Sequence, residues 1–194
     1  MLLHNKLKKY KIFLASKSPR RHELLKLLNI DFAVQLFDVE EIVPDHLKNE
    51  DVPVYLSQLK AKEAQKKINE HEIVITADTI VILNDKILGK PKDKEHAILM
   101  LKTLSANTHI VYTGITVTSK EKQASEVCMT KVYFKALTDE EINYYIDTFK
   151  PFDKAGSYGI QEWIGAVGVE KIEGCYYNIM GLPIHLLNKL LLSF

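Results

Sequence analysis

The sequence predicts a mixed α/β domain in which helices flank a long twisted sheet. Residues 72–76 form a continuous apolar run, which is typical of a strand buried on both faces of a sheet. Before residue 105, segments with helical spacing of apolar residues alternate with short strands, and a meander of two longer strands follows. This order is not a regular β–α–β winding.

The length of 194 residues suits one domain, spanning 1–194, with two lobes. The 26 basic and 25 acidic residues nearly balance, so nothing indicates a general nucleic-acid surface. No apolar run approaches the roughly 20 residues of a membrane helix, and residues 1–6 lack the apolar core of a signal peptide. We therefore expect a cytoplasmic protein. Its two cysteines, Cys128 and Cys175, are expected to be reduced thiols, since they suit neither a disulfide framework nor a metal site.

The first long helix is predicted to follow a short strand at 12–14. Ser18 is a favourable N-cap, and Pro19 fits the first helical position, where its missing N–H group costs nothing. Asn29 can close the helix in the left-handed conformation. The expected buried stripe consists of Leu24, Leu27 and Leu28.

The middle of the chain continues with alternating strands and helices. We expect a strand at 32–37, a helix at 54–68, and a strand from residue 72 that turns back at Asn84–Asp85. Asp93 is an N-cap candidate for the next helix. The buried face of that helix is expected to consist of Ala97, Met100, Leu101 and Leu104.

The last part of the chain begins with the two meander strands, at 111–118 and 127–137. Residues 138–141 form a capping box that opens a helix, and a glycine-bearing loop follows at 152–161. The remaining elements are expected to be strands at 167–172 and 176–179 and a helix at 184–192.

Two arginines, Arg20 and Arg21, lie in the first turn of the predicted helix. The helix macrodipole disfavours cations there by about 0.3–1 kcal/mol each. An anion would reverse this penalty, because backbone N–H groups and two guanidinium groups would converge on it. We interpret the stretch as a phosphate-binding strand–loop–helix. The alternative is that both arginines are simply solvated on a surface helix.

Acidic and basic residues elsewhere are candidates for chemistry. Asp78 directly follows the apolar run, and a carboxylate at a strand end can hold a divalent cation or take a proton from water. It could equally be a turn-forming aspartate. Glu40 and Glu41 are adjacent acids in a turn, where solvation is the usual state. The candidate lysines, none informative alone, are Lys60, Lys90 and Lys154.

These side chains together have the composition expected of a site for a triphosphate and its metal. Cationic groups would neutralise phosphate oxygens, and carboxylates would bind Mg²⁺, which keeps most of its water shell. The sequence contains no Walker-type loop, no G-x-G-x-x-G fingerprint and no recognisable nucleophile elbow. A metal-activated water is therefore favoured over covalent catalysis.

The ordered set of motifs resembles the Maf family, nucleoside triphosphate pyrophosphatases also known as septum formation proteins. The motifs occur in family order over nearly the whole chain. They are the segments 14–25, Lys60-Ala61, Ala77-Asp78-Thr79, Gly89-Lys90-Pro91, 153–161 and 177–183.

The resemblance implies hydrolysis of a nucleoside triphosphate to the monophosphate and pyrophosphate, with Mg²⁺ or Mn²⁺. It also implies a fold like that of Maf and ITPase proteins, with two lobes around a central nucleotide cleft. Asp78 matches the proton acceptor that activates water and also contacts the metal. Glu41, with Glu40 as the alternative, matches an acid on the metal side. The residues matching the substrate cleft are Ser16, Arg20, Arg21, Lys60, Thr79, Lys90, Lys154 and Gln161.

The branch of the family that acts on dTTP and UTP looks like this chain at Arg20, Thr79 and Gln161. Physically, the Gln161 amide offers a donor and an acceptor that could pair with the O4/N3–H edge of thymine or uracil. Two departures from the family pattern are Lys150, where an acid is common, and Cys175, where a small hydroxyl residue is common. Modified pyrimidine nucleotides remain open as substrates.

Two other functions are compatible with the same residues. The first is a nucleotide-sensing regulator of cell division that binds nucleotide with little turnover. The second, a nucleic-acid binder using Arg20 and Arg21, is disfavoured by the balanced charge. Otherwise no nucleic-acid or membrane partner is expected, and the resemblance is compatible with a homodimer.

Overall fold

The computed structural model describes residues 2–194 and divides the chain into two compact units. The first comprises the chain up to Asp78, Thr113–Cys128 and Gly181–Phe194, and the second comprises Thr79–Tyr112 and Met129–Met180. Within the described residues, seven strands form one sheet in the order β2-β1-β3-β5-β6-β7, with β4 paired to β3. The mixed α/β class is confirmed, whereas a single domain over 1–194 stays a prediction. No helix among residues 2–194 is long and apolar enough to cross a membrane.

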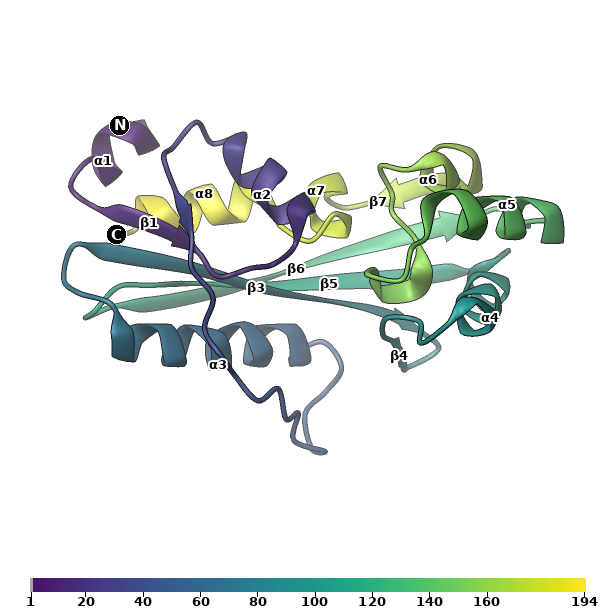
Figure 1. Cartoon of the computed structure of the whole chain (residues 1–194), viewed down its shortest axis with the longest axis horizontal. Coiled ribbons are helices and arrows are strands. Elements are labelled where there is room, and N and C mark those ends of the chain that lie inside the picture. Colours follow the sequence, from purple (N-terminus) through teal and green to yellow (C-terminus); the bar gives the residue numbers. More distant parts are fainter. Residues whose placement is uncertain (1) are drawn as a thin grey trace. The chain divides into compact units, whose positions relative to one another are not determined.

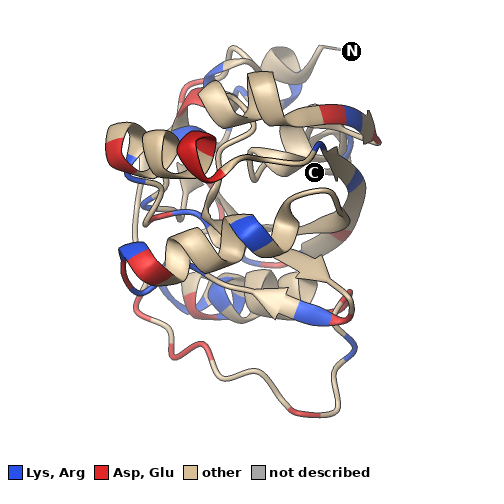
Figure 2. Ribbon diagram, turned by 90° about the vertical axis from the view of Figure 1, so that its right-hand side faces the viewer, with Lys and Arg blue, Asp and Glu red and all other residues tan. Residues whose placement is uncertain are grey.

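Three long strands contribute residues to both units. They are β3 (Glu72–Leu83), β5 (Thr108–Thr118) and β6 (Gln123–Phe134). The predicted meander is confirmed, but β5 and β6 both begin earlier than the sequence pattern indicated, and β6 ends at Phe134 instead of residue 137. Basic and acidic residues are both scattered over the helices and loops (Figure 2), in keeping with the near-zero net charge.

The first unit places helices on both faces of its strands. Helix α3 (Val52–Lys67) lies on one face, and α1 (Leu3–Leu7), α2 (Pro19–Lys26) and α8 (Ile184–Leu192) lie on the other (Figure 1). Strand β1 (Lys11–Leu14) runs parallel to β2 (Ala33–Val34) and to β3, with Leu14 opposite Ile75. The carboxyl end of β1 therefore delivers the loop 15–18 and the start of α2 beside the middle of β3. Ligands of open α/β sheets bind at this end of parallel strands.

The second unit is built on local turns and caps that the sequence predicted well. Asn84 and Asp85 both have positive φ, 48° and 61°, as a two-residue hairpin turn requires, and β4 (Lys86–Leu88) returns antiparallel to β3. Asp93 accepts a 2.7 Å hydrogen bond from the His96 N–H and caps α4 (Lys94–Leu104). The capping box of α5 (Asp139–Phe149) is also present. The predicted buried face of α4 is confirmed at Ala97, Met100, Leu101 and Leu104.

Predictions about the first helix and the strand after it were partly wrong. Helix α2 ends at Lys26, so Leu27 is the C-cap residue and 59% exposed, whereas Leu24 and Leu25 are buried. Asn29 does adopt the left-handed conformation, with φ 50°. The strand predicted at 32–37 is reduced to β2, because β1 ends at Leu14 and offers no backbone partner beyond that point.

The strand predicted at 176–179 is instead the short helix α7 (Tyr176–Ile179). Side-chain hydrogen bonds replace a strand ladder here: Thr130 Oγ1 accepts from the Cys175 N–H at 3.0 Å, and the Asn178 amide donates to the Val111 carbonyl at 3.0 Å. The strand expected at 167–172 is β7 (Val169–Glu173), preceded by helix α6 (Trp163–Gly168).

Asp78 was predicted at the end of a strand but lies within β3, which continues to Leu83. Strand β1 pairs with β3 up to Ile75, and β4 pairs with it from Val81. Asp78 therefore occupies the interval between these two partners. The alternative of a turn-forming aspartate is wrong, because no turn occurs at this position.

Candidate active site

The loop from β1 into α2 is held by hydrogen bonds among its own residues. Ser16 is buried, and its Oγ accepts from the Ser18 N–H at 3.2 Å. The His22 Nε2 group donates to the Ser16 carbonyl at 2.7 Å, one turn into the helix. Pro19 occupies the first helical turn as predicted, but the Ser18 side chain makes no capping hydrogen bond. His22 was not assigned a role from the sequence, although its position i+6 from Ser16 made such a contact feasible.

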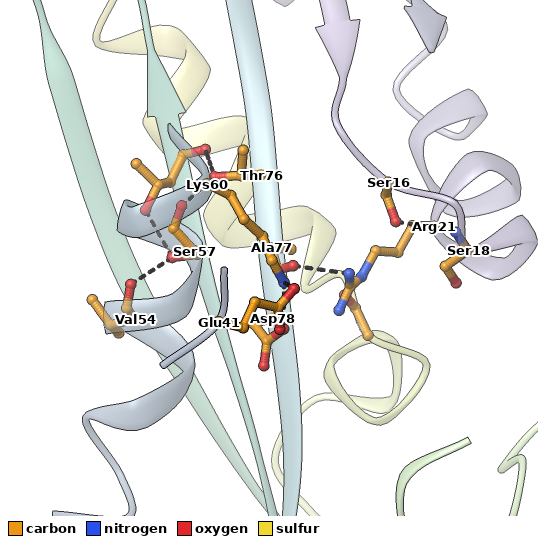
Figure 3. A network of polar contacts seen from close by, with 12 residues as sticks. Ser16, Ser18, Arg21, Glu41, Val54, Ser57, Lys60, Thr76, Ala77 and Asp78 are labelled. Carbon is orange, nitrogen blue, oxygen red and sulfur yellow. Dashed lines mark hydrogen bonds and ion pairs between the residues drawn. The ribbon is translucent and has the colours of Figure 1, made fainter. Parts of the chain in front are cut away.

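The Arg21 side chain points from the start of α2 toward the middle of β3 (Figure 3). Its Nη1 donates to the Ala77 carbonyl at 2.8 Å, and its Nε donates to the Gly181 carbonyl at 2.8 Å. Burial lowers the pKa of the Arg21 guanidinium, Asp78 raises it, Arg20 lowers it and Glu41 raises it. Guanidinium groups nevertheless remain charged at neutral pH. The half-buried Arg21 is therefore not a freely solvated surface arginine.

Lys60 lies between two carboxylates. Its Nζ is 2.7 Å from Asp78 Oδ1 and 3.1 Å from Glu41 Oε1 (Figure 3). Lys60 and Asp78 are mostly buried, with side chains 18% and 16% exposed, whereas Glu41 is half exposed on the loop before α3. Glu41 and Glu40 were the two alternatives for the acid on the metal side. The structure brings Glu41 to this cluster.

A network of buried hydroxyl groups positions this cluster. Thr76 Oγ1 donates to the Ser57 carbonyl at 2.7 Å, and Ser57 Oγ shares a 2.8 Å hydrogen bond with Thr116 Oγ1. Thr76 and Asp78 are two residues apart on a strand, so their side chains point to the same face. Ser57 and Lys60 are three residues apart on a helix, so they are neighbours along one side of α3. The network thus sets which residue of α3 faces Asp78.

The two carboxylates suit a divalent cation. Mg²⁺ binds through one or two carboxylates plus substrate phosphates and keeps several waters. Glu41 and Asp78 already converge on one positive charge, the Lys60 ammonium, so their donor set fits a cation. Among residues 2–194 no group of three or more His, Cys, Asp or Glu side chains could form a metal cage by itself. Such a site would therefore depend on substrate and water for its remaining ligands.

The second unit carries the other predicted site residues. Thr79 follows Asp78 on β3, and Lys90 is exposed between β4 and α4. The Gly156 N–H donates to the Gly89 carbonyl at 3.1 Å, which places the 89–91 turn beside the glycine-bearing loop. Gln161 is exposed at the edge of a surface depression of about 470 Å³. The apolar side chains around that depression include Ile160, Val169, Ile172 and Tyr176.

Lys154 is buried, unlike the exposed lysine that its residue type suggests. Its Nζ lies 2.8 Å from Asp153 Oδ1 and 3.0 Å from Glu162 Oε1. Glu162 also accepts a hydrogen bond from Tyr145, whose hydroxyl oxygen accepts from the Gly159 N–H at 3.0 Å. Burial and then Glu162 raise the pKa of Tyr145 well above its usual range. These contacts join the two ends of the 153–162 loop and tie its C-terminal end to α5, a role that the sequence did not reveal for Glu162 or Tyr145.

Comparison with known proteins identifies the family of this chain. A family model described as Maf-like protein matches residues 11–194. The chain belongs to the Maf family. A relative from Porphyromonas gingivalis, named dTTP/UTP pyrophosphatase, is 48% identical over 191 residues, covering 97% of this chain and 96% of the relative.

Two further relatives bear the same name. Proteins of Bacteroides fragilis and Flavobacterium johnsoniae are each 50% identical, over 184 and 182 residues, and cover 94% of this chain and 95% and 94% of their own lengths. A solved structure, that of the Staphylococcus aureus Ham1 protein, superposes with a TM-score of 0.57 at 17% identity. It covers 94% of this chain and 98% of its own. That similarity confirms the fold.

Proposed function

We propose that this Maf protein hydrolyses dTTP and UTP to the monophosphate and pyrophosphate. The relatives with this name match almost the full chain at about half identity. The observation that carries the proposal is the convergence of Glu41, Lys60, Asp78 and Arg21 around the middle of β3. Cationic and anionic groups within one small region suit a polyphosphate and its counter-ion.

The proposed division of labour follows from charge and position. Asp78 accepts the proton of the attacking water, since its carboxylate is mostly shielded from solvent at the centre of the cluster. Arg20, Arg21 and Ser16 at the start of α2 bind phosphate oxygens, as does Lys60. Lys90 and Lys154 stay predicted members of the substrate site; for Lys154, burial against Glu162 supports a positioning role.

Glu41 and Asp78 are the residues that would hold a divalent cation. When bound, Mg²⁺ or Mn²⁺ would neutralise charge on the phosphates during hydrolysis. Thr79 and Gln161 are proposed to contribute to recognition of the pyrimidine nucleotide. The exposed Gln161 amide beside a depression with apolar walls could pair with the base edge.

The test is a screen of nucleoside triphosphates with Mg²⁺ or Mn²⁺, scored for pyrophosphate and orthophosphate separately. We expect pyrophosphate from dTTP and UTP. Asp78→Asn should lower kcat by at least about a hundredfold, the usual contribution of a general base. Asp45→Asn, an exposed acid on the same loop as Glu41, is the matched control and should retain activity. Orthophosphate as the sole product, or nucleotide binding without turnover, would contradict the proposal.

A further inference from the structure

Lys60 stands where a bound cation would be attracted. Its ammonium contacts one oxygen of Asp78 at 2.7 Å and one of Glu41 at 3.1 Å, the two carboxylates proposed for the metal. An ammonium and a divalent cation both require carboxylate oxygens at close range. Repulsion between the two cations is also strong in a mostly buried site. The ammonium and the metal ion therefore compete for the same pair of carboxylates.

We propose that the Lys60 ammonium occupies the cation position until the metal binds, and that the side chain then moves to the phosphates of the nucleotide. This movement couples metal binding to nucleotide binding. This inference rests on the proposed function. The side chain is suited to such a move, because a lysine has a flexible four-carbon stem and three rotatable donors. The backbone of α3 would stay in place, since Ser57 and Thr76 hold the helix against β3.

The opposite role makes the opposite prediction. If Lys60 were a fixed strut that holds Glu41 and Asp78 in position, its removal would disorder the carboxylates and weaken metal binding. If Lys60 competes with the metal, its removal leaves two unopposed carboxylates and strengthens metal binding in the absence of nucleotide. The direction of the change therefore separates the two roles, and it requires no activity measurement.

The experiment measures Mn²⁺ affinity of the full chain by electron paramagnetic resonance of free Mn²⁺, without nucleotide. Lys60→Met and Lys60→Gln should each bind Mn²⁺ at least about fivefold more tightly than the wild type, the lower end of ordinary coupling between sites. Lys62→Met, an exposed lysine on the same helix, controls for loss of general positive charge. It should change the affinity by less than about twofold, because exposed charges are screened. Unchanged or weaker binding in both Lys60 variants overturns the inference.

If metal binding favours nucleotide binding, nucleotide binding must favour metal binding equally, and this provides a second measurement. A non-hydrolysable UTP analogue should tighten Mn²⁺ binding in the wild type more than in Lys60→Met, because only the wild type frees an ammonium for the phosphates. Equal tightening in both proteins overturns the inference while leaving the proposed function intact. A third measurement uses only the wild type. Added Mg²⁺ should increase the acetylation of Lys60 relative to the acetylation of Lys62, as measured by mass spectrometry. Failure of the proposed function would show separately, as no pyrophosphate release from any nucleotide.

Discussion

Thr76 Oγ1 donates a hydrogen bond of 2.7 Å to the carbonyl oxygen of Ser57, and this contact joins strand β3 to helix α3 in a buried position. Asp78 lies two residues beyond Thr76, and Lys60 lies three residues beyond Ser57. A shift of the helix by one residue would rotate Lys60 by about 100° away from Asp78. The 2.7 Å ion pair between Lys60 and Asp78 therefore depends on this remote contact.

Replacing Thr76 with valine tests this dependence. Thr76→Val keeps the shape of the side chain but removes the donor to Ser57, so we expect a loss of about 1–2 kcal/mol in the free energy of unfolding. We also expect a lower kcat for UTP, because the register of α3 that places Lys60 beside the site loosens. Thr118→Val is the control: Thr118 is also buried, but its Oγ1 makes only longer contacts, at 3.3 and 3.4 Å. Urea titrations give the free energy of unfolding of both variants, and kinetics give their kcat values. A Thr76→Val variant with the full wild-type kcat would contradict the prediction.

Gly114 on β5 permits the close approach of helix α3. A Cβ atom at this position would lie 2.4 Å from the carbonyl carbon and oxygen of Pro53 and from the Val54 nitrogen, all backbone atoms that cannot move without displacing the helix. Gly114→Ala should cost about 3 kcal/mol and lower Tm by about 6–12 °C. Gly89→Ala is the matched control, since a Cβ there meets nothing within 4 Å and φ is not in the left-handed range. Equal Tm values for the two variants would show that α3 can shift freely.

Local signals made much of the fold predictable. The caps of α4 and α5, the turn at Asn84–Asp85 and the buried face of α4 depend on residues close in sequence. The errors arose where distant residues decide the backbone. Strand β2 is short because its partner β1 ends, and α7 forms because Thr130 and Asn178 supply hydrogen bonds that no local pattern reveals.

The candidate site was predictable in its residue types but not in its contacts. The unfavourable charge at the start of α2 and the family motifs pointed to Arg21, Lys60 and Asp78. The sequence could not show that Lys60 joins Asp78 to Glu41, because this requires the register of α3 on β3. Nor could it show that Lys154 is buried against Glu162, since the seven intervening residues form an irregular loop.

The Lys154–Glu162 pair is expected to contribute more to stability than surface pairs do. With side chains 9% and 18% exposed, the two charges are largely removed from water. A double-mutant cycle with Lys154→Met and Glu162→Gln should give a coupling energy of about 1–3 kcal/mol. The control cycle uses Lys171→Met and Glu173→Gln, an exposed pair at 2.6 Å, and should give less than about 1 kcal/mol.

Kinetics of the same variants separate two roles for Lys154. If Lys154 acts by holding the loop that carries Gln161, Glu162→Gln should raise KM for UTP about as much as Lys154→Met does. If Lys154 instead binds a phosphate directly, only Lys154→Met should raise KM. The first outcome is the one we expect from the burial of the pair.

His109 should make the stability of the protein fall as the pH decreases below 6.5. The ring is fully buried, shares a 2.7 Å hydrogen bond with the Tyr158 hydroxyl and contacts the rings of Phe134 and Tyr158. Burial lowers the pKa of His109 from 6.5 to about 4. Between these values the unfolded chain binds a proton that the folded chain does not, so the stabilising contribution is complete above pH 6.5 and is lost as the pH falls toward 4. Between pH 7 and pH 5, His109 accounts for a loss of about 2 kcal/mol in the free energy of unfolding.

His109→Gln removes the titration while keeping a hydrogen-bonding group for Tyr158. We measure the free energy of unfolding in urea at pH 7 and at pH 5. The decrease from pH 7 to pH 5 should be about 2 kcal/mol smaller in His109→Gln than in the wild type. His46→Gln, which changes an exposed histidine of the 35–51 loop, should keep the wild-type slope. The difference between the slopes isolates the contribution of His109, because the three proteins differ only at the substituted histidines. Parallel slopes for the wild type and His109→Gln would mean that the ring takes up its proton without unfolding.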